Sequence, residues 1–135
     1  MKVVLFCGGL GTRLKAYSDT MPKPMVPVGE RPILWHLMRY YAHYGHTDFI
    51  LCLGHGGDVI ARWIAEDPEA CAPSWRVTCV DTGLAASVGE RLVAVRAHVD
   101  GDPVFLANYS DALSDLDLGA YVEAALRRGT VAAFA

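Results

Sequence analysis

Three glycines and an arginine follow a short apolar run near the start of the chain. The run 3–6 is continuously apolar, which is typical of a strand buried on both faces of a parallel sheet. Gly8, Gly9 and Gly11 come directly after it. Glycine lets backbone N–H groups approach a ligand, and such a loop can donate several hydrogen bonds to phosphate oxygens. Because Arg13 adds a fork of N–H donors suited to bidentate phosphate contact, this segment predicts a phosphate site.

Two common glycine-rich phosphate motifs do not fit the segment. A Walker loop ends in Gly-Lys-Ser/Thr, whereas Thr12 and Arg13 follow Gly11 here. The dinucleotide fingerprint has a third glycine where this chain has Leu14. A glycine-rich turn by itself is equally compatible with a tight turn after a first strand.

A lysine between two prolines lies a few residues further on. Pro22 and Pro24 flank Lys23. Proline restricts its own backbone and that of the residue before it, so we expect no helix here and extended geometry at Met21 and Lys23. Lys23 would then project from a stiff segment and lose little entropy on pairing with an anion. The alternative for any lone lysine is a solvated surface position.

Acidic residues follow another apolar run, at 103–107, which we expect to be a buried strand. Asp111, Asp115 and Asp117 come after it. Open α/β sheets bind ligands beyond the C-terminal ends of their strands, and Mg²⁺ on a triphosphate takes one or two protein carboxylates. Asp111 is nearest to the strand and is the predicted metal ligand, although it could be an ordinary turn residue. Asp117 suits a helix N-cap and Asp115 a solvated turn.

Strand and helix patterns alternate along the rest of the chain. Further strands are expected at 49–53, 75–80 and 130–134, and helices at 33–44, 58–64, 90–98 and 116–128, with Asp58 capping the second helix. This alternation predicts an α/β fold: a three-layer, open, mainly parallel sheet with right-handed crossovers and Rossmann-like topology. There is no internal repeat or linker, so 1–135 is expected to belong to one domain.

Composition narrows the class of protein. The chain has 135 residues, a net charge of −3 and a 53% hydrophobic fraction, which indicates a globular domain and argues against nucleic-acid binding. No apolar stretch approaches the roughly 20 residues that span a bilayer, and no signal-peptide pattern is present. The four cysteines form no CxxC pair, and Cys52 and Cys79 lie in apolar runs. We therefore expect reduced, buried thiols and a cytoplasmic protein without a membrane partner.

The first two segments together resemble the signature of the sugar-1-phosphate nucleotidylyltransferases. They read Gly8-Gly-Leu-Gly-Thr-Arg-Leu14 and Pro22-Lys-Pro-Met25. The resemblance implies the nucleotide-diphospho-sugar transferase type of fold, with catalytic roles for Arg13 and Lys23. It implies nucleotide binding by Gly8, Gly9, Leu10, Gly11, Thr12, Arg13 and Lys23. The segment 109–115 resembles the family's metal-binding segment, which implies Mg²⁺ on Asp111, although Ala112 stands where glycine is usual.

A third region resembles the cytidylyl-transferring members of the family. It runs from Asp81-Thr-Gly83 to Val88-Gly-Glu-Arg91, where those members have a Thr-Gly-Gly-Arg stretch that touches the nucleotide. The resemblance carries nucleotide binding onto Gly89 and Arg91, whereas Val88 and Glu90 depart from the pattern. Arg91 could instead be a solvated residue of a first helical turn. The segments 32–38, 50–54 and 81–83 resemble those cytidylyl-transferring members that act on glucose 1-phosphate. The implied reaction joins CTP to α-D-glucose 1-phosphate and gives CDP-glucose and pyrophosphate.

The resemblance covers the N-terminal part of the family fold. Members are considerably longer, and Ala135 falls at the end of an expected strand, so we expect residues 1–135 to be the N-terminal nucleotide-binding part of one nucleotidyltransferase domain. The full-length protein is expected to be a homo-oligomer, and a chain of this length alone to show little turnover. Two alternatives remain: an enzyme that uses UTP or dTTP, and a truncated, non-catalytic nucleotide-binding module.

Overall fold

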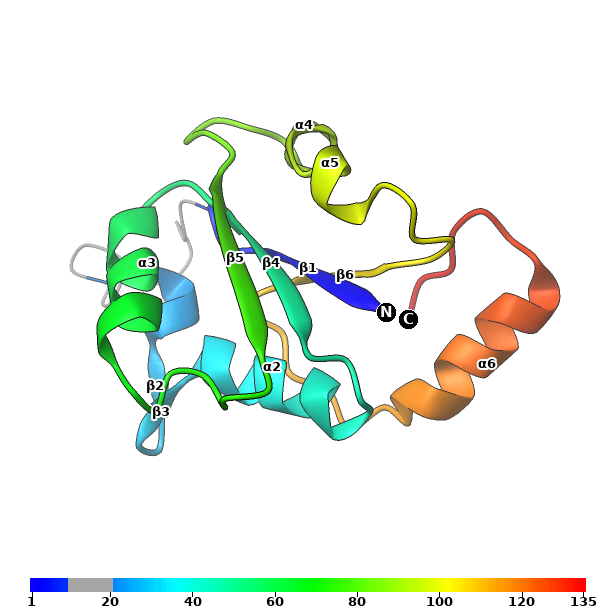
Figure 1. Cartoon of the computed structure of the whole chain (residues 1–135), viewed down its shortest axis with the longest axis horizontal. Coiled ribbons are helices and arrows are strands. Elements are labelled where there is room, and N and C mark those ends of the chain that lie inside the picture. Colours follow the sequence, from blue (N-terminus) through cyan, green and yellow to red (C-terminus); the bar gives the residue numbers. More distant parts are fainter. Residues whose placement is uncertain (10–20) are drawn as a thin grey trace.

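A parallel sheet of four strands runs through the centre of the molecule (Figure 1). The structure is a computed structural model that describes residues 1–9 and 21–135. The strands are β1 (Lys2–Phe6), β4 (Asp48–Leu53), β5 (Arg76–Asp81) and β6 (Leu106–Tyr109), in the order β5-β4-β1-β6. Successive strands extend the sheet on one side of β1, and β6 returns to the other side. The C-terminal ends of β1 and β6 therefore flank a topological switch point, where open α/β sheets bind ligands.

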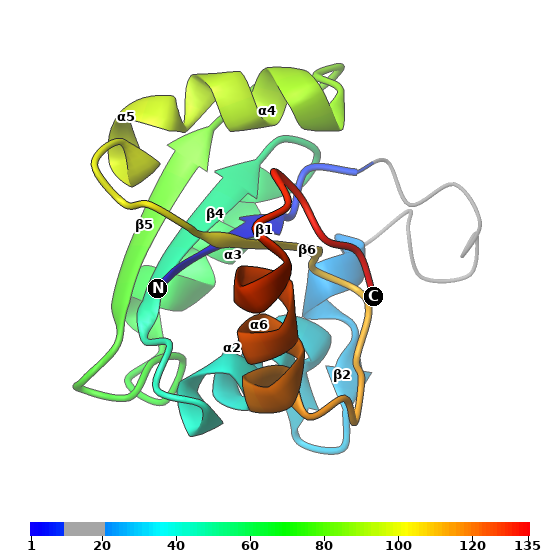
Figure 2. The same ribbon diagram turned by 90° about the vertical axis from the view of Figure 1, so that its right-hand side faces the viewer.

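Helices cover both faces of the sheet and make three layers (Figure 2). One face carries α2 (Ile33–His43), α3 (Gly57–Glu66) and α6 (Leu118–Arg128), and the other carries α4 (Val88–Ala94) and α5 (Arg96–Val99). The predicted three-layer, parallel α/β fold is confirmed.

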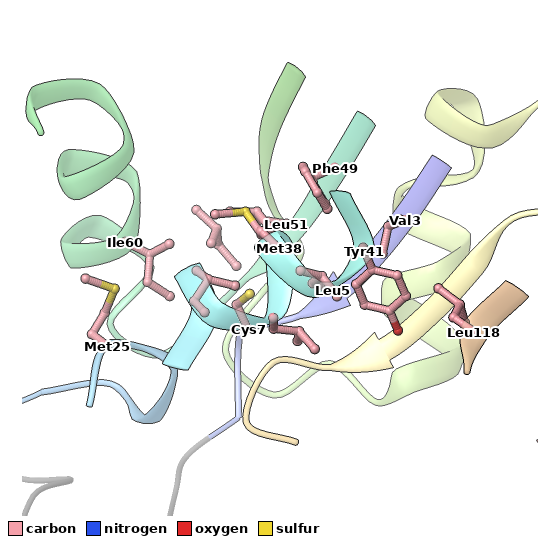
Figure 3. Close-up of a cluster of buried hydrophobic side chains, with 13 residues drawn as sticks. Val3, Leu5, Cys7, Met25, Met38, Tyr41, Phe49, Leu51, Ile60 and Leu118 are labelled. Carbon is pink, nitrogen blue, oxygen red and sulfur yellow. The ribbon is translucent and has the colours of Figure 1, made fainter. Parts of the chain in front are cut away.

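The strands alternate their side chains between two cores. Val3 and Leu5 of β1 pack with α2 and α3, whereas Val4 packs on the opposite face, and all three are fully buried. Figure 3 shows the larger core, in which Met38 and Tyr41 of α2 lie against the sheet. A strand with helices on both faces needs apolar side chains at every position, which explains its continuous apolar run.

The segment after the glycine loop contains small elements. A 3₁₀ turn, η1 (Lys23–Met25), precedes a short antiparallel hairpin of β2 (Pro27–Val28) and β3 (Arg31–Pro32). The expectation of extended backbone at Lys23 is wrong. Proline is tolerated in a first helical turn, where its missing N–H would have no partner, and the turn is closed by the N–H of Met25 donating to Pro22 O at 2.8 Å.

Two predicted helical segments differ in detail. The expected helix 90–98 begins at Val88 and divides into α4 and α5. Asp58 does not cap α3: Gly56 is the N-cap, with a left-handed φ of 64°, and Asp58 lies in the first turn. The N-cap expected at Asp117 is confirmed, because its side chain accepts a hydrogen bond from Ala120 N at 3.0 Å.

Three expectations about the strands are wrong. The segment 130–134 forms no strand, and Val131 and Phe134 are exposed, since a strand needs a hydrogen-bonded neighbour. The strand expected at 103–107 lies at 106–109. Cys79 was expected to be buried, but it is exposed on β5, the edge strand, whereas Cys52 of the inner strand β4 is buried.

Within the described ranges, no helix is long and apolar enough to cross a membrane.

Candidate functional site

A cavity of about 260 Å³ opens at the topological switch point. Its walls come from the C-terminal ends of β1 and β6, from η1 and from the start of α4. The lining residues are Phe6, Cys7, Gly9, Lys23, Pro24, Ala86, Val88, Arg91, Tyr109, Ser110 and Asp111. Four predicted site residues from separate segments thus meet around one space: Gly9, Lys23, Arg91 and Asp111.

Lys23 and Asp111 form an ion pair at this cavity. The Lys23 ammonium donates a hydrogen bond to Asp111 Oδ2 at 2.7 Å, across 88 residues of sequence. The 3₁₀ turn places the lysine, and the end of β6 places the aspartate. Their side chains are 24% and 32% exposed, so solvent and small ligands can reach both. An anion could replace the carboxylate at Lys23, and a cation could replace the ammonium at Asp111.

The carboxylate of Asp111 suits the predicted role as a Mg²⁺ ligand only if phosphate oxygens supply further ligands. Among the residues that the structure describes, no cluster of three or more His, Cys, Asp or Glu side chains could hold a metal ion. A single carboxylate beside an open cavity suits Mg²⁺, which commonly takes one or two carboxylates and completes its shell with phosphate oxygens and water. The donor set therefore suits an ion that arrives with a triphosphate.

Arg91 is buried below the loop that follows β1. Its side chain comes from α4, and the residue is only 5% exposed. Nη1 donates to Leu53 O at 2.9 Å and to Thr82 Oγ1 at 2.5 Å, and Nη2 donates to Gly8 O at 3.1 Å. The alternative of a solvated Arg91 is therefore wrong. The guanidinium joins the ends of β1, β4 and β5.

Glycines allow the strand-end loops to approach each other closely. A Cβ on Gly8 would lie 2.3 Å from Arg91 Nη1, and a Cβ on Gly54 would lie 3.0 Å from Gly8 Cα. At Gly56, φ is 64° and a Cβ would lie 2.8 Å from Pro22 Cβ. Gly8 is thus required by packing against Arg91, independently of any ligand. At Gly9, by contrast, no atom of the described residues beyond its chain neighbours would lie within 4 Å of a Cβ.

Several residues at the site were not predicted from the sequence. Thr82 Oγ1 donates to Leu53 O at 2.7 Å beside Arg91, and Ser110 Oγ donates to Phe6 O at 2.8 Å. Tyr109 is 58% exposed at the cavity, with its ring edge-on to Phe6. The glycine-rich stretch after β4, at 54–57, was a signal of a close approach, because glycine often marks such places.

Cys7 lies in the cavity wall but is not an available nucleophile. It is 1% exposed, and burial raises the pKa of its thiol to about 12. At neutral pH the sulfur is therefore protonated, and the thiolate is the reactive form.

The remaining predicted residues are Gly89 and four residues that the structure does not describe. Gly89 is exposed in α4 and is not among the described residues that line the cavity. Leu10, Gly11, Thr12 and Arg13 lie outside the described residues, so their nucleotide-binding and catalytic roles stay predictions.

Known proteins are similar to this chain in sequence. Residues 2–134 match the nucleotidyl transferase family. Glucose-1-phosphate cytidylyltransferase of Salmonella typhimurium is 39% identical, with 91% of this chain and 55% of that protein covered. The probable glucose-1-phosphate cytidylyltransferase of Bacillus subtilis is 32% identical, with 87% and 53% covered. The chain spans about half the length of the curated relatives it matches.

Solved structures with a similar fold are also found. HddC from Yersinia pseudotuberculosis, complexed with GMP-PN, superposes with a TM-score of 0.75 at 29% identity, covering 93% of this chain and 54% of that one. The UTP-bound UGPase from Acinetobacter baumannii gives a TM-score of 0.76 at 21% identity, covering 92% and 53%, and supports the fold alone. The resemblance to the N-terminal part of the sugar-1-phosphate nucleotidylyltransferases is confirmed, and the chain belongs to the nucleotidyl transferase family.

Proposed function

We propose that the protein transfers a nucleotidyl group from a nucleoside triphosphate to a sugar 1-phosphate and releases pyrophosphate. The pair formed by Lys23 and Asp111 carries the proposal, because it brings a cation and a carboxylate that could hold Mg²⁺ to one cavity. That cavity lies at the switch point, where folds of this kind bind nucleotides. Membership of the family supports the same reaction class.

The chemistry needs positioning and charge neutralisation more than proton transfer. The attacking sugar phosphate is already an anion, so no general base is required. Lys23 would exchange its carboxylate partner for oxygens of the α-phosphate and of the incoming phosphate. Arg13 and the N–H groups of the glycine loop would stabilise the leaving pyrophosphate. Asp111 would hold Mg²⁺, which neutralises developing charge and orients the triphosphate when bound.

The favoured substrates are CTP and α-D-glucose 1-phosphate, with CDP-glucose as the product. Two relatives at 39% and 32% identity are named as cytidylyltransferases of glucose 1-phosphate, one of them as probable. The HddC structure at 29% identity holds GMP-PN, so the base is open to test.

A substrate panel tests the reaction and the base together. The protein in its natural length would be mixed with α-D-glucose 1-phosphate, Mg²⁺ and either CTP, UTP, dTTP or GTP. Pyrophosphate release and nucleotide-sugar formation would be followed in parallel. We expect the highest kcat/KM with CTP and a product that co-elutes with CDP-glucose. Faster turnover with UTP or dTTP would change the assigned base, and nucleotide binding without pyrophosphate release would favour the non-catalytic alternative.

A further inference from the structure

The carbonyl of Gly8 is held in one direction by the protein itself. Its oxygen accepts a hydrogen bond from Arg91 Nη2 at 3.1 Å and a longer one from His55 N at 3.4 Å. Both donors belong to segments that follow other strands, β4 and β5. The carbonyl is therefore turned toward Arg91 and the loop after β4.

This direction decides where the next N–H points. In a planar trans peptide, the C=O and the following N–H point in opposite directions, and no cis peptide bond occurs in the described chain. With the Gly8 carbonyl turned to Arg91, the N–H of Gly9 points away from Arg91. Gly9 lines the cavity, and among the described residues beyond its chain neighbours no heavy atom lies within 4 Å of where its Cβ would be. A ligand can therefore come close to this part of the backbone.

We propose that Arg91 is a positioning residue that acts through the Gly8–Gly9 peptide and keeps the Gly9 N–H directed at the triphosphate. This inference rests on the proposed function and deepens it. A peptide between two glycines rotates easily, because glycine accepts φ of either sign. If it rotated, a carbonyl oxygen would face the phosphate in place of an N–H donor. Arg91 prevents this rotation through the hydrogen bond from Nη2.

Arg91 also lines the cavity, but its existing hydrogen bonds and low exposure favour action through the peptide over direct contact with the nucleotide. The residue is 5% exposed, and its two terminal nitrogens already donate to acceptors of the protein. Thr82 orients the guanidinium in turn, since its hydroxyl accepts from Nη1 at 2.5 Å while donating to Leu53 O. Thr82 is therefore a second positioning residue, one step further from the ligand.

Inorganic tripolyphosphate tests the inference, because it has no base and no sugar. Its dissociation constant would be measured by calorimetry on the protein in its natural length, beside that of the nucleoside of the accepted triphosphate. Arg91→Met and Arg91→Lys should each weaken tripolyphosphate binding about 10- to 100-fold, the range for a lost hydrogen bond to a charged group. Nucleoside binding should change less than about twofold. Arg91→Lys keeps the charge but not the fork of donors, so it separates positioning from charge.

Controls and contrary outcomes distinguish this inference from the proposed function. Arg96→Met removes the same charge from an exposed neighbouring position and should leave tripolyphosphate binding unchanged. If the wild type binds nucleotide but Arg91→Lys keeps full tripolyphosphate affinity, or if both ligands weaken equally, the positioning role is wrong and the proposed function stands. If the wild type binds neither tripolyphosphate nor any triphosphate, the proposed function itself fails. Should the Arg91 variants not fold, Thr82→Val should still weaken tripolyphosphate binding several-fold, and an unchanged affinity there overturns the inference.

Discussion

Lys23 and Arg91 bring positive charge to the same end of the sheet, but they hold it in different ways. Lys23 is partly exposed and is paired with one carboxylate, Asp111. Arg91 is buried and donates to two backbone carbonyls and one hydroxyl. A phosphate and a metal ion can separate the first pair, because each supplies a new partner for one member. No ligand supplies a new partner for the carbonyls of Leu53 and Gly8.

The difference between Lys23 and Arg91 indicates that the two cations have different roles at the site. A cation that can change partners suits contact with substrate, whereas a cation held by the backbone suits a fixed loop shape. The two kinds should respond differently to substitution. Changes at Lys23 should lower activity and leave stability nearly unaltered, whereas changes around Arg91 should lower stability as well.

Loss of the Lys23 ammonium should give the largest effect. Lys23→Met should lower kcat about 100- to 1,000-fold, the range seen when one donor to a developing charge is removed. The free energy of unfolding should change by less than about 1 kcal/mol, because the pair is partly solvent-screened. Steady-state kinetics and urea unfolding measure the two quantities.

Lys2 provides a matched control. It contacts Asp102 at 2.7 Å, and these side chains are 28% and 33% exposed, close to the values of the Lys23 pair. Lys2 begins β1, at the opposite end from the cavity. Because Lys2 lies away from the cavity and its ion pair is partly solvent-screened, Lys2→Met should leave kcat within about twofold. Equal losses in the two variants would mean that Lys23 has no special part in the reaction.

Adding a methyl group at Gly8 should give the next largest effect. Gly8→Ala places a Cβ 2.3 Å from Arg91 Nη1, so the guanidinium must move and lose hydrogen bonds to buried carbonyls. We expect a loss of about 2–4 kcal/mol in unfolding free energy. Chemical denaturation of Gly8→Ala beside Gly9→Ala measures it.

Gly9 is the control for the loss of backbone freedom that any glycine-to-alanine change brings. A Cβ there meets no heavy atom of the part of the chain that the structure describes within 4 Å, chain neighbours apart, and its φ is not positive. Gly9→Ala should therefore alter stability by less than about 1 kcal/mol. Similar destabilisation by both substitutions would show that the contact with Arg91 is not what requires glycine at position 8.

The parts of the fold that sequence predicts are those with a local cause. Burial on two faces makes β1 and β4 continuous apolar runs, and the N-cap preference of aspartate marks the start of α6 at Asp117. The segment 130–134 has the same apolar character as a strand but pairs with none of the described strands. Strand formation depends on a neighbour, and composition does not report a neighbour.

At the site, too, individual residues were predicted from the sequence but the contacts between them were not. Lys23 and Asp111 were predicted as residues that act on a triphosphate, from their positions near a glycine loop and a strand end. Their ion pair joins residues 88 positions apart, and no local pattern contains it. The burial of Arg91 was also missed, because two of its three acceptors are backbone carbonyls, which every sequence possesses.

The helix that carries Arg91 offers the smallest and most specific test. Ser87 caps α4, and its N–H and its hydroxyl both donate to the Glu90 carboxylate at 2.7 Å. These hydrogen bonds, led by that from the backbone, hold the pKa of Glu90 below its ordinary value of 4.5. A carboxylate with a lowered pKa in the folded state stabilises the protein above the unfolded pKa, and this contribution is lost as the pH falls through the folded pKa.

Glu90→Gln should therefore remove a small part of the acid dependence of stability. Unfolding free energies measured by urea titration between pH 3 and pH 7 should differ most between wild type and Glu90→Gln near neutral pH, and should converge on acidification. Because Glu90 only supports the helix and does not touch Arg91 in any hydrogen bond of the described chain, tripolyphosphate binding at pH 7 should stay within about twofold of wild type. A larger loss of affinity would show that the cap of α4, as well as Arg91 and Thr82, is needed to hold the loop in its binding conformation.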